Sequence, residues 1–108
     1  MNATADKISN VTVTLKANIY FDGGVISHSL AHTDGKRQTV GIIRPGKYHF
    51  NTDAPERMDI IAGQCEVLLT GESQWKSYKG GQFFNVPGKS GFDIRVHEGV
   101  AEYLCSFK

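Results

Sequence analysis

The chain has 108 residues, of which 40% are hydrophobic and 21% charged, and 12 basic and 11 acidic side chains leave a formal net charge of +1. This length and composition predict one globular domain and argue against a disordered chain. The balanced charge offers no basic face for nucleic acid or an anionic membrane. No apolar run approaches the roughly 20 residues of a membrane-spanning helix.

Residues 1–10 are polar and contain no apolar stretch of the signal-peptide type. We therefore expect a flexible N-terminal lead over residues 1–10 and a folded domain over residues 11–108. A secreted scaffold of this size usually carries more than two cysteines. We accordingly expect a cytoplasmic protein in which Cys65 and Cys105 are reduced and act as small buried hydrophobic residues.

From residue 11 onward the dominant sequence period is two, which is typical of strands. Short strands are predicted at Val11–Leu15, Val25–Leu30, Thr39–Ile43, Lys47–Phe50, Met58–Ile61, Cys65–Leu69, Trp75–Tyr78, Gln82–Val86, Phe92–Val96 and Tyr103–Phe107. Turn signals such as Asp22–Gly24 and Pro45–Gly46 separate these runs, and no window shows a helical stripe. The pattern predicts a single all-β domain, either a barrel or a two-sheet jelly roll, with a mouth that can bind a small molecule.

Several common catalytic motifs are absent from the sequence. There is no glycine-rich phosphate loop of the Walker or dinucleotide type and no Gly-x-Ser-x-Gly elbow. Cys65 and Cys105 are too far apart in sequence to form a zinc-finger pair. His28 and His32 are four residues apart, but in a strand and turn that spacing does not bring two side chains together as it would on a helix.

Two stretches resemble the signature motifs of the cupin family. In the first motif, cupins place a glutamate, six residues and a glycine, and Glu56 and Gly63 match that spacing. In the second, cupins place a glycine, five residues and a proline, which Gly81 and Pro87 match. The resemblance implies a cupin-type jelly-roll β-barrel in which both motifs form hairpins beside the barrel mouth.

The metal-binding part of the cupin pattern is not retained. Where metal-dependent cupins place three histidines, this chain has His49, Asn51 and Phe92. One histidine and one glutamate would hold a transition metal weakly. We therefore expect a cupin that uses no metal cofactor.

A more specific resemblance covers Ala17–Lys108. It is carried by Tyr20-Phe21-Asp22-Gly23, Tyr48-x-Phe50-x-Thr52, Pro55-Glu56-x-Met58, Trp75-x-x-Tyr78, Phe84-x-Val86-Pro87-x-x-Ser90-x-Phe92 and Tyr103-Leu104-Cys105. In order and spacing these pieces are similar to the pyrimidine/purine nucleoside phosphorylase family. The resemblance implies a pentosyltransferase of broad specificity that forms homodimers and requires no metal. It would split purine and pyrimidine nucleosides with inorganic phosphate, giving a free base and a pentose 1-phosphate.

Phosphorolysis requires binding groups for phosphate and for ribose. For phosphate we expect Arg37, because a guanidinium makes paired hydrogen bonds to phosphate oxygens and the resembling family has an arginine there. Ser90 is a second candidate, since its hydroxyl can donate to phosphate or sugar. For ribose we expect Glu56, whose carboxylate can accept from both sugar hydroxyls, with Met58 packed against the sugar.

Broad specificity favours an aromatic slot for the base, because every base has a π-face. The candidates are Tyr48, Phe50, Phe84, Phe92 and Tyr103. The hydroxyl of Tyr103 can also touch the leaving base.

Three other readings of the sequence stay open. A pocket without an obvious general base suits a cupin that binds a small molecule without catalysis, because fold alone does not fix function. The second is a metal-dependent cupin enzyme that uses His49 and Glu56 together with His28 or His97. The third is a structural or adaptor protein, in which Glu56 and Arg37 would be dispensable.

Overall fold

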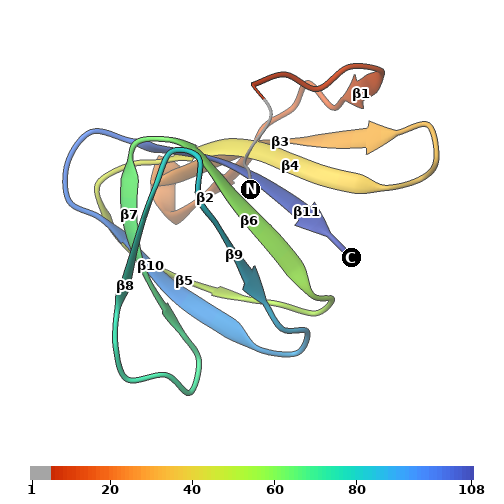
Figure 1. Cartoon of the computed structure of the whole chain (residues 1–108). Helices are drawn as coiled ribbons and strands as arrows, with labels where there is room; N and C mark the ends of the chain where they lie inside the picture. Colours follow the sequence, from red (N-terminus) through yellow and green to blue (C-terminus); the bar gives the residue numbers. More distant parts are fainter. Residues whose placement is uncertain (1–5) are drawn as a thin grey trace.

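The computed structural model describes residues 6–108. Among these residues it contains eleven strands, one short 3-10 turn and no α-helix (Figure 1). The elements are β1 (Val11–Val13), β2 (Asn18–Tyr20), η1 (Phe21–Gly23), β3 (Val25–His32), β4 (Arg37–Ile43), β5 (Gly46–Asn51), β6 (Glu56–Ala62), β7 (Gln64–Leu69), β8 (Lys76–Lys79), β9 (Phe83–Val86), β10 (Gly91–Val96) and β11 (Ala101–Phe107). Within the described residues, no helix has the length and apolar character needed to cross a membrane.

The strands form two antiparallel sheets that face each other (Figure 1). The larger sheet has the order β1-β3-β4-β11-β6-β9, with β2 also paired to β3, and the smaller sheet has the order β5-β10-β7-β8. The predicted all-β jelly roll is therefore confirmed, although the two sheets remain separate hydrogen-bonded networks rather than one closed sheet. Every predicted strand is present, and the sequence pattern missed only the three-residue β2.

The register of β11 aligns side chains in rows across the inner face of the larger sheet. Tyr103 lies opposite Gly41 and Ile60, Cys105 opposite Thr39 and Met58, and Phe107 opposite Glu56. Because alternate residues of a strand share a face, these rows point together into the space between the sheets. The functional side chains of the larger sheet therefore come from strands that are far apart in sequence.

The space between the sheets is filled mainly by aliphatic side chains. The most deeply buried include Val25, Ile43, Ile60, Val86 and Ile94. Both cysteines are free and buried, as predicted.

The N-terminal part of the chain adds to the edge of the larger sheet. Residues 6–10 contain no strand, and the remainder of the predicted lead, residues 1–5, lies outside the described residues. Strand β1 pairs antiparallel with β3 of the same chain. The flexible lead over residues 1–10 stays a prediction.

The turn between β2 and β3 has an unusual backbone. Phe21 and Asp22 both have φ of 54°, in the left-handed region that non-glycine residues rarely adopt. The ring of Phe21 packs against Tyr48 and Phe50, with centroids 5.1 Å and 5.6 Å away. These contacts hold the strained turn against the smaller sheet, beside the cavity described below.

Candidate functional site

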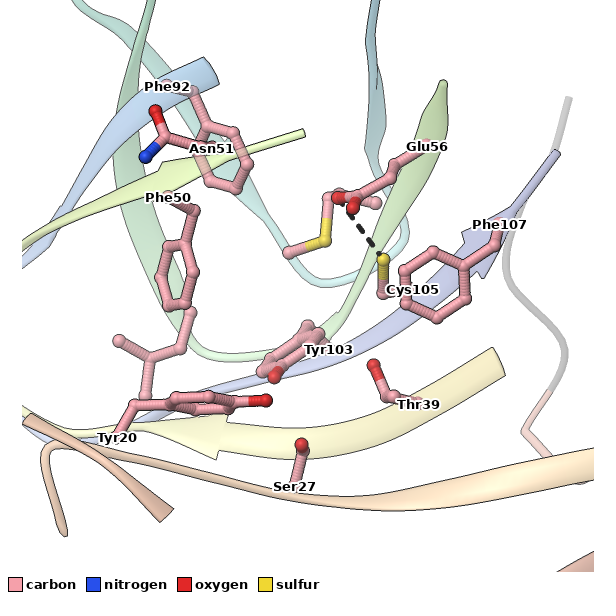
Figure 2. A pocket seen from close by; sticks show the side chains of 12 residues that line it. Tyr20, Ser27, Thr39, Phe50, Asn51, Glu56, Phe92, Tyr103, Cys105 and Phe107 are labelled. Carbon is pink, nitrogen blue, oxygen red and sulfur yellow. Dashed lines mark hydrogen bonds between the residues drawn. The ribbon is translucent and has the colours of Figure 1, made fainter. Parts of the chain in front are cut away.

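A cavity of about 270 Å³ lies between the two sheets (Figure 2). Its volume is near the lower end of the roughly 300–1,000 Å³ of small-molecule sites. It is lined by Tyr20, Ser27, Thr39, Ile43, Phe50, Asn51, Glu56, Met58, Phe92, Tyr103, Cys105 and Phe107. The larger sheet contributes most of the polar groups together with the rings of Tyr20, Tyr103 and Phe107, and the smaller sheet contributes Phe50, Asn51 and Phe92 (Figure 2).

The polar side begins at Ser27 and Tyr103. The residue between them in the register is Gly41, which has no side chain to separate them. Burial raises the pKa of Tyr103 to about 12, and the nearby hydroxyls of Ser27 and Thr39 only partly offset that rise. Tyr103 is therefore a neutral hydrogen-bonding group at neutral pH.

Glu56 ends the same polar row at the first position of β6. Desolvation raises the pKa of this carboxyl, and a hydrogen bond from Cys105 Sγ to Oε1, 3.5 Å long, partly offsets that rise. Among the described residues that line the cavity, Glu56 is the only carboxylate. A half-buried carboxylate of this kind can accept hydrogen bonds from a polyol and favours a positive charge nearby.

The aromatic side is built from Phe50 of β5 and Phe92 of β10. These residues are partners in the antiparallel register, and their rings stack with centroids 5.6 Å apart and an interplanar angle of 27°. Tyr20 meets Phe50 edge-on at 6.2 Å. Phe50 and Phe92 give the cavity an apolar aromatic wall, which suits a planar heterocycle.

Arg37 lies in a second depression that adjoins the cavity. That depression is lined by His32, Asp34, Lys36, Arg37, Gln38, Ser106, Phe107 and Lys108. Phe107 lines both depressions. Arg37 is two residues before Thr39 on β4, so strand alternation gives the two side chains the same face. The structure thus places a basic group next to the cavity, beyond Phe107, and not inside it.

The structure brings five of the predicted site residues together and places four outside the cavity lining. The five are Phe50, Glu56, Met58, Phe92 and Tyr103. The four are Arg37, Tyr48, Phe84 and Ser90. The contacts of Tyr48, Phe84 and Ser90 give these three residues a packing or loop role.

Tyr48 donates from its hydroxyl to the carbonyls of Arg44 and Pro45, both at 3.0 Å. Phe84 lies behind the aromatic side, with its ring edge-on to Phe92 at 5.6 Å. The backbone of Ser90 bonds Thr52 twice, since the Ser90 N–H donates to Thr52 Oγ1 and the Ser90 carbonyl accepts from the Thr52 N–H. Ser90 therefore anchors the loop before β10.

Seven lining residues were not singled out from the sequence as site residues. They are Tyr20, Ser27, Thr39, Ile43, Asn51, Cys105 and Phe107. Ser27 and Thr39 each occupy an inward position of a strand, but the polar residues Ser29 and Arg37 lie on the same faces, so polarity at such a position does not by itself mark the site. What the pattern lacked was the register, which decides whether such residues meet.

The histidines do not lie where a cupin metal centre would need them. His49 Nδ1 donates to Asp93 Oδ1 at 2.7 Å, and Nε2 lies 2.9 Å from Asn51 Oδ1. His49 neighbours Phe50 on β5 and therefore points to the opposite face, away from Glu56. Within residues 6–108, no three His, Cys, Asp or Glu side chains gather closely enough to hold a metal ion. The residues present do not supply the ligand set of a cupin metal centre.

Comparison with known families gives a match over nearly the whole chain. The family model described as pyrimidine/purine nucleoside phosphorylase matches residues 15–107. A protein of that name from Burkholderia orbicola (strain MC0-3) is 48% identical over 104 residues, covering 96% of this chain and 97% of its own. Another from Methylobacillus flagellatus is 50% identical over 102 residues, covering 94% and 98%.

Solved structures agree on the fold. A protein of unknown function from Acinetobacter sp. ADP1 superposes with a TM-score of 0.93 at 39% identity, covering 96% of this chain and 100% of its own. A cupin superfamily protein from Desulfitobacterium hafniense superposes with a TM-score of 0.64 at 15% identity, covering 86% and 82%. Bacillus subtilis oxalate decarboxylase gives 0.73 at 16%, covering 98% of this chain and 31% of its own. The cupin-type jelly roll predicted from the sequence is confirmed.

Proposed function

Because the chain belongs to the pyrimidine/purine nucleoside phosphorylase family, we propose that it splits both purine and pyrimidine nucleosides with inorganic phosphate. The observation that carries this proposal is the two-sided cavity. It has a polar row that ends in Glu56, a stacked aromatic surface opposite that row, and the basic depression of Arg37 beyond Phe107. A nucleoside has the matching composition of one polyol and one flat heterocycle.

The reaction forms a bond between a phosphate oxygen and C1′ of the pentose and breaks the bond between C1′ and the base nitrogen. The bonding electron pair leaves with the base. The proton of the incoming monohydrogen phosphate balances the proton that the base takes up. Such a transfer needs neither a protein nucleophile nor a metal, because correct placement of the two substrates can supply a large part of the rate enhancement.

Glu56 is the residue that we assign to the sugar. Its carboxylate can accept hydrogen bonds from the pentose hydroxyls. As C1′ becomes electron-poor in the transition state, the negative charge of this half-buried carboxylate stabilises it. Met58 follows two residues later on the same face of β6 and can pack against the ring of the sugar.

Arg37 is the residue that we assign to phosphate. In the depression that it lines, Lys36 and Lys108 add positive charge, and Asp34 is the only acidic side chain in that lining. Phosphate bound by Arg37 would lie next to Phe107 and could reach a sugar held by Glu56. Paired hydrogen bonds from the guanidinium would orient the attacking oxygen.

The aromatic surface accounts for the proposed broad specificity. Phe50 and Phe92 offer a π-face to any base and make no hydrogen bond that would select one. We further propose that the enzyme uses phosphate as its only co-substrate without a metal cofactor, acts in the cytoplasm and forms a homodimer. Its partners would then be nucleosides and phosphate, with neither nucleic acid nor a membrane.

The test is base release from uridine and inosine by chelator-treated protein, with and without phosphate. We expect release of uracil and hypoxanthine only when phosphate is present, with an equal amount of ribose 1-phosphate. Saturable nucleoside binding without any product would favour the non-catalytic cupin. Activity that chelation abolishes and added metal restores would favour the metal-dependent enzyme.

A further inference from the structure

We infer that Cys105 is a positioning residue, whose thiol holds the carboxylate of Glu56 in the orientation that receives the pentose. The inference rests on the proposed function, in which Glu56 binds the sugar. A buried free cysteine usually serves only to pack the core. Here Cys105 would also orient a carboxylate, whereas Cys65 would not.

The geometry places the thiol against the carboxylate. Cys105 lies opposite Met58 in the register of β11 and β6, so Glu56 is its diagonal neighbour on the same face. Cys105 Sγ donates to Glu56 Oε1 at 3.5 Å (Figure 2). One carboxylate oxygen is therefore engaged by the protein, which leaves the other, Oε2, for a ligand.

Cys105 also has polar neighbours on the side away from Glu56. Thr39 lies directly opposite it on β4, and both side chains line the cavity. Tyr103 and Ser27 line the same cavity and face Gly41 from the two neighbouring strands. Polar side chains thus lie on four neighbouring strands of the larger sheet, from Ser27 on β3 to Glu56 on β6.

A neutral thiol suits this position. Burial raises the pKa of Cys105, and the nearby charge of Glu56 raises it further, so the sulfur keeps its proton and can donate. Cys105 is 4% exposed, so bulk water does not compete for the contact. A donor to the ionised form of a carboxylate favours that form.

Few other charged groups face Glu56. Strand β9 presents Val86 opposite it, and β11 presents Phe107. The neighbouring Arg57 is turned to the other face of β6, where it binds Asp59. Arg37 and Lys108 lie in the adjoining depression beyond Phe107. The hydrogen bond from Cys105 is therefore the direct polar contact that the described residues make with the Glu56 carboxylate.

The experiment compares Cys105→Ala and Cys105→Ser with Cys65→Ala as the matched control. Cys65 is also free and buried, at 2% exposed, but it packs in the smaller sheet and does not line the cavity. For each variant, kcat/KM for uridine and inosine is measured against pH, together with the melting temperature. Cys105→Ser retains a donor, so it separates the loss of a hydrogen bond from the loss of the cysteine.

We expect Cys105→Ala to lower kcat/KM about tenfold. It should also shift the acidic inflection of the pH profile to higher pH, because Glu56 loses a hydrogen-bond donor to its ionised form. Cys105→Ser should keep most of the activity, with its acidic inflection at the same pH as in the unmodified protein or at a lower pH. Cys65→Ala should lower the melting temperature without shifting the acidic inflection of the pH profile. Equal pH profiles for Cys105→Ala and Cys65→Ala would overturn the inference.

A second measurement separates this inference from the proposed function. The carboxyl carbon of Glu56 can be titrated by NMR in the free protein, with no substrate present. Cys105→Ala should raise the pKa of Glu56 relative to the unmodified protein, and Cys105→Ser should not. A shift in the free protein, with no phosphorolysis of any nucleoside, would sink the proposed function and leave the thiol–carboxylate contact established. The absence of a shift would refute the contact itself, whatever the activity.

Discussion

Arg37 and Glu56 line two separate depressions that meet at the ring of Phe107. Among the described side chains, neither Arg37 nor Glu56 forms an ion pair. Each charge therefore stays available for a ligand. An anion on one side and a sugar on the other would meet next to the same aromatic ring.

Arg37→Ala should raise the KM for phosphate by about tenfold or more, because a charged hydrogen bond contributes roughly 1.5–3 kcal/mol and tenfold corresponds to about 1.4 kcal/mol. The KM for the nucleoside should change little. Initial rates at varied phosphate and fixed uridine check this. Lys36→Ala is the matched control, since the Lys36 side chain is 80% exposed and 4.0 Å from Asp34. Equal effects of the two substitutions would show that the depression acts only through its overall charge.

Glu56→Gln should lower kcat/KM by roughly tenfold to a hundredfold, since it removes the charge while keeping the shape. The same change should raise the melting temperature at neutral pH. Burial raises the pKa of Glu56, so its contribution to stability is full below the unfolded-state pKa and is lost as the pH rises through the folded-state value. Calorimetry should therefore show a larger increase in the melting temperature of Glu56→Gln over the unmodified protein at pH 7 than at pH 4. If Glu56→Gln were less stable at both pH values, the ionised Glu56 carboxylate would not be destabilising the folded protein.

Phe50→Leu should weaken binding of uridine and inosine to a similar degree, by about tenfold, because stacking of a base on an aromatic ring contributes roughly 1–3 kcal/mol. Calorimetric titration of each nucleoside without phosphate measures this directly. Phe83→Leu controls for the loss of an aromatic ring elsewhere, because Phe83 is 41% exposed and stacks with Arg57 outside the cavity. A loss confined to one of the two bases would argue against an unselective aromatic surface.

His49→Gln should lower stability most at acidic pH. The hydrogen bonds from His49 to Asp93 and Asn51 raise the pKa of this histidine. Its contribution is therefore full below the unfolded-state value, near 6.5, and disappears as the pH rises through the raised folded-state value. Melting temperatures from pH 5 to pH 9 should separate the two proteins at pH 5 and converge toward pH 9. His97→Gln tests whether any exposed histidine beside a carboxylate behaves alike, since His97 lies 2.6 Å from Glu66 Oε1.

Much of the fold could be predicted from local pattern, because a half-buried strand shows its period within five or six residues. Trp75–Tyr78 was predicted within one residue of β8. The three residues of β2 are too few to show a period, and two of them, Ile19 and Tyr20, are exposed. Strand β2 is defined instead by its antiparallel pairing with β3, in which Ile19 lies opposite Ile26.

The site was harder to predict, because a cavity depends on register between distant strands. Phe50, Glu56 and Phe92 were found through the family resemblance, and the structure places all three in the lining. Tyr48 alternates with Phe50 in the same way, yet its ring turns toward Gly24 and Gly46, where no side chain competes for the space. Sequence alone cannot tell which of Tyr48 and Phe50 lines the cavity, because the answer depends on the residues that pack against each ring.

The polar row depends on a missing side chain in the middle of β4. A Cβ atom at Gly41 would collide with the carbonyl oxygen of Ile26 and would approach Ser27 Cβ to 2.7 Å. Glycine weakens the interior of a strand, and β4 is bordered on both sides by β3 and β11. The larger sheet therefore contains a weakened position at its centre, and the missing side chain there is what lets Ser27 and Tyr103 face the same space from opposite sides of β4.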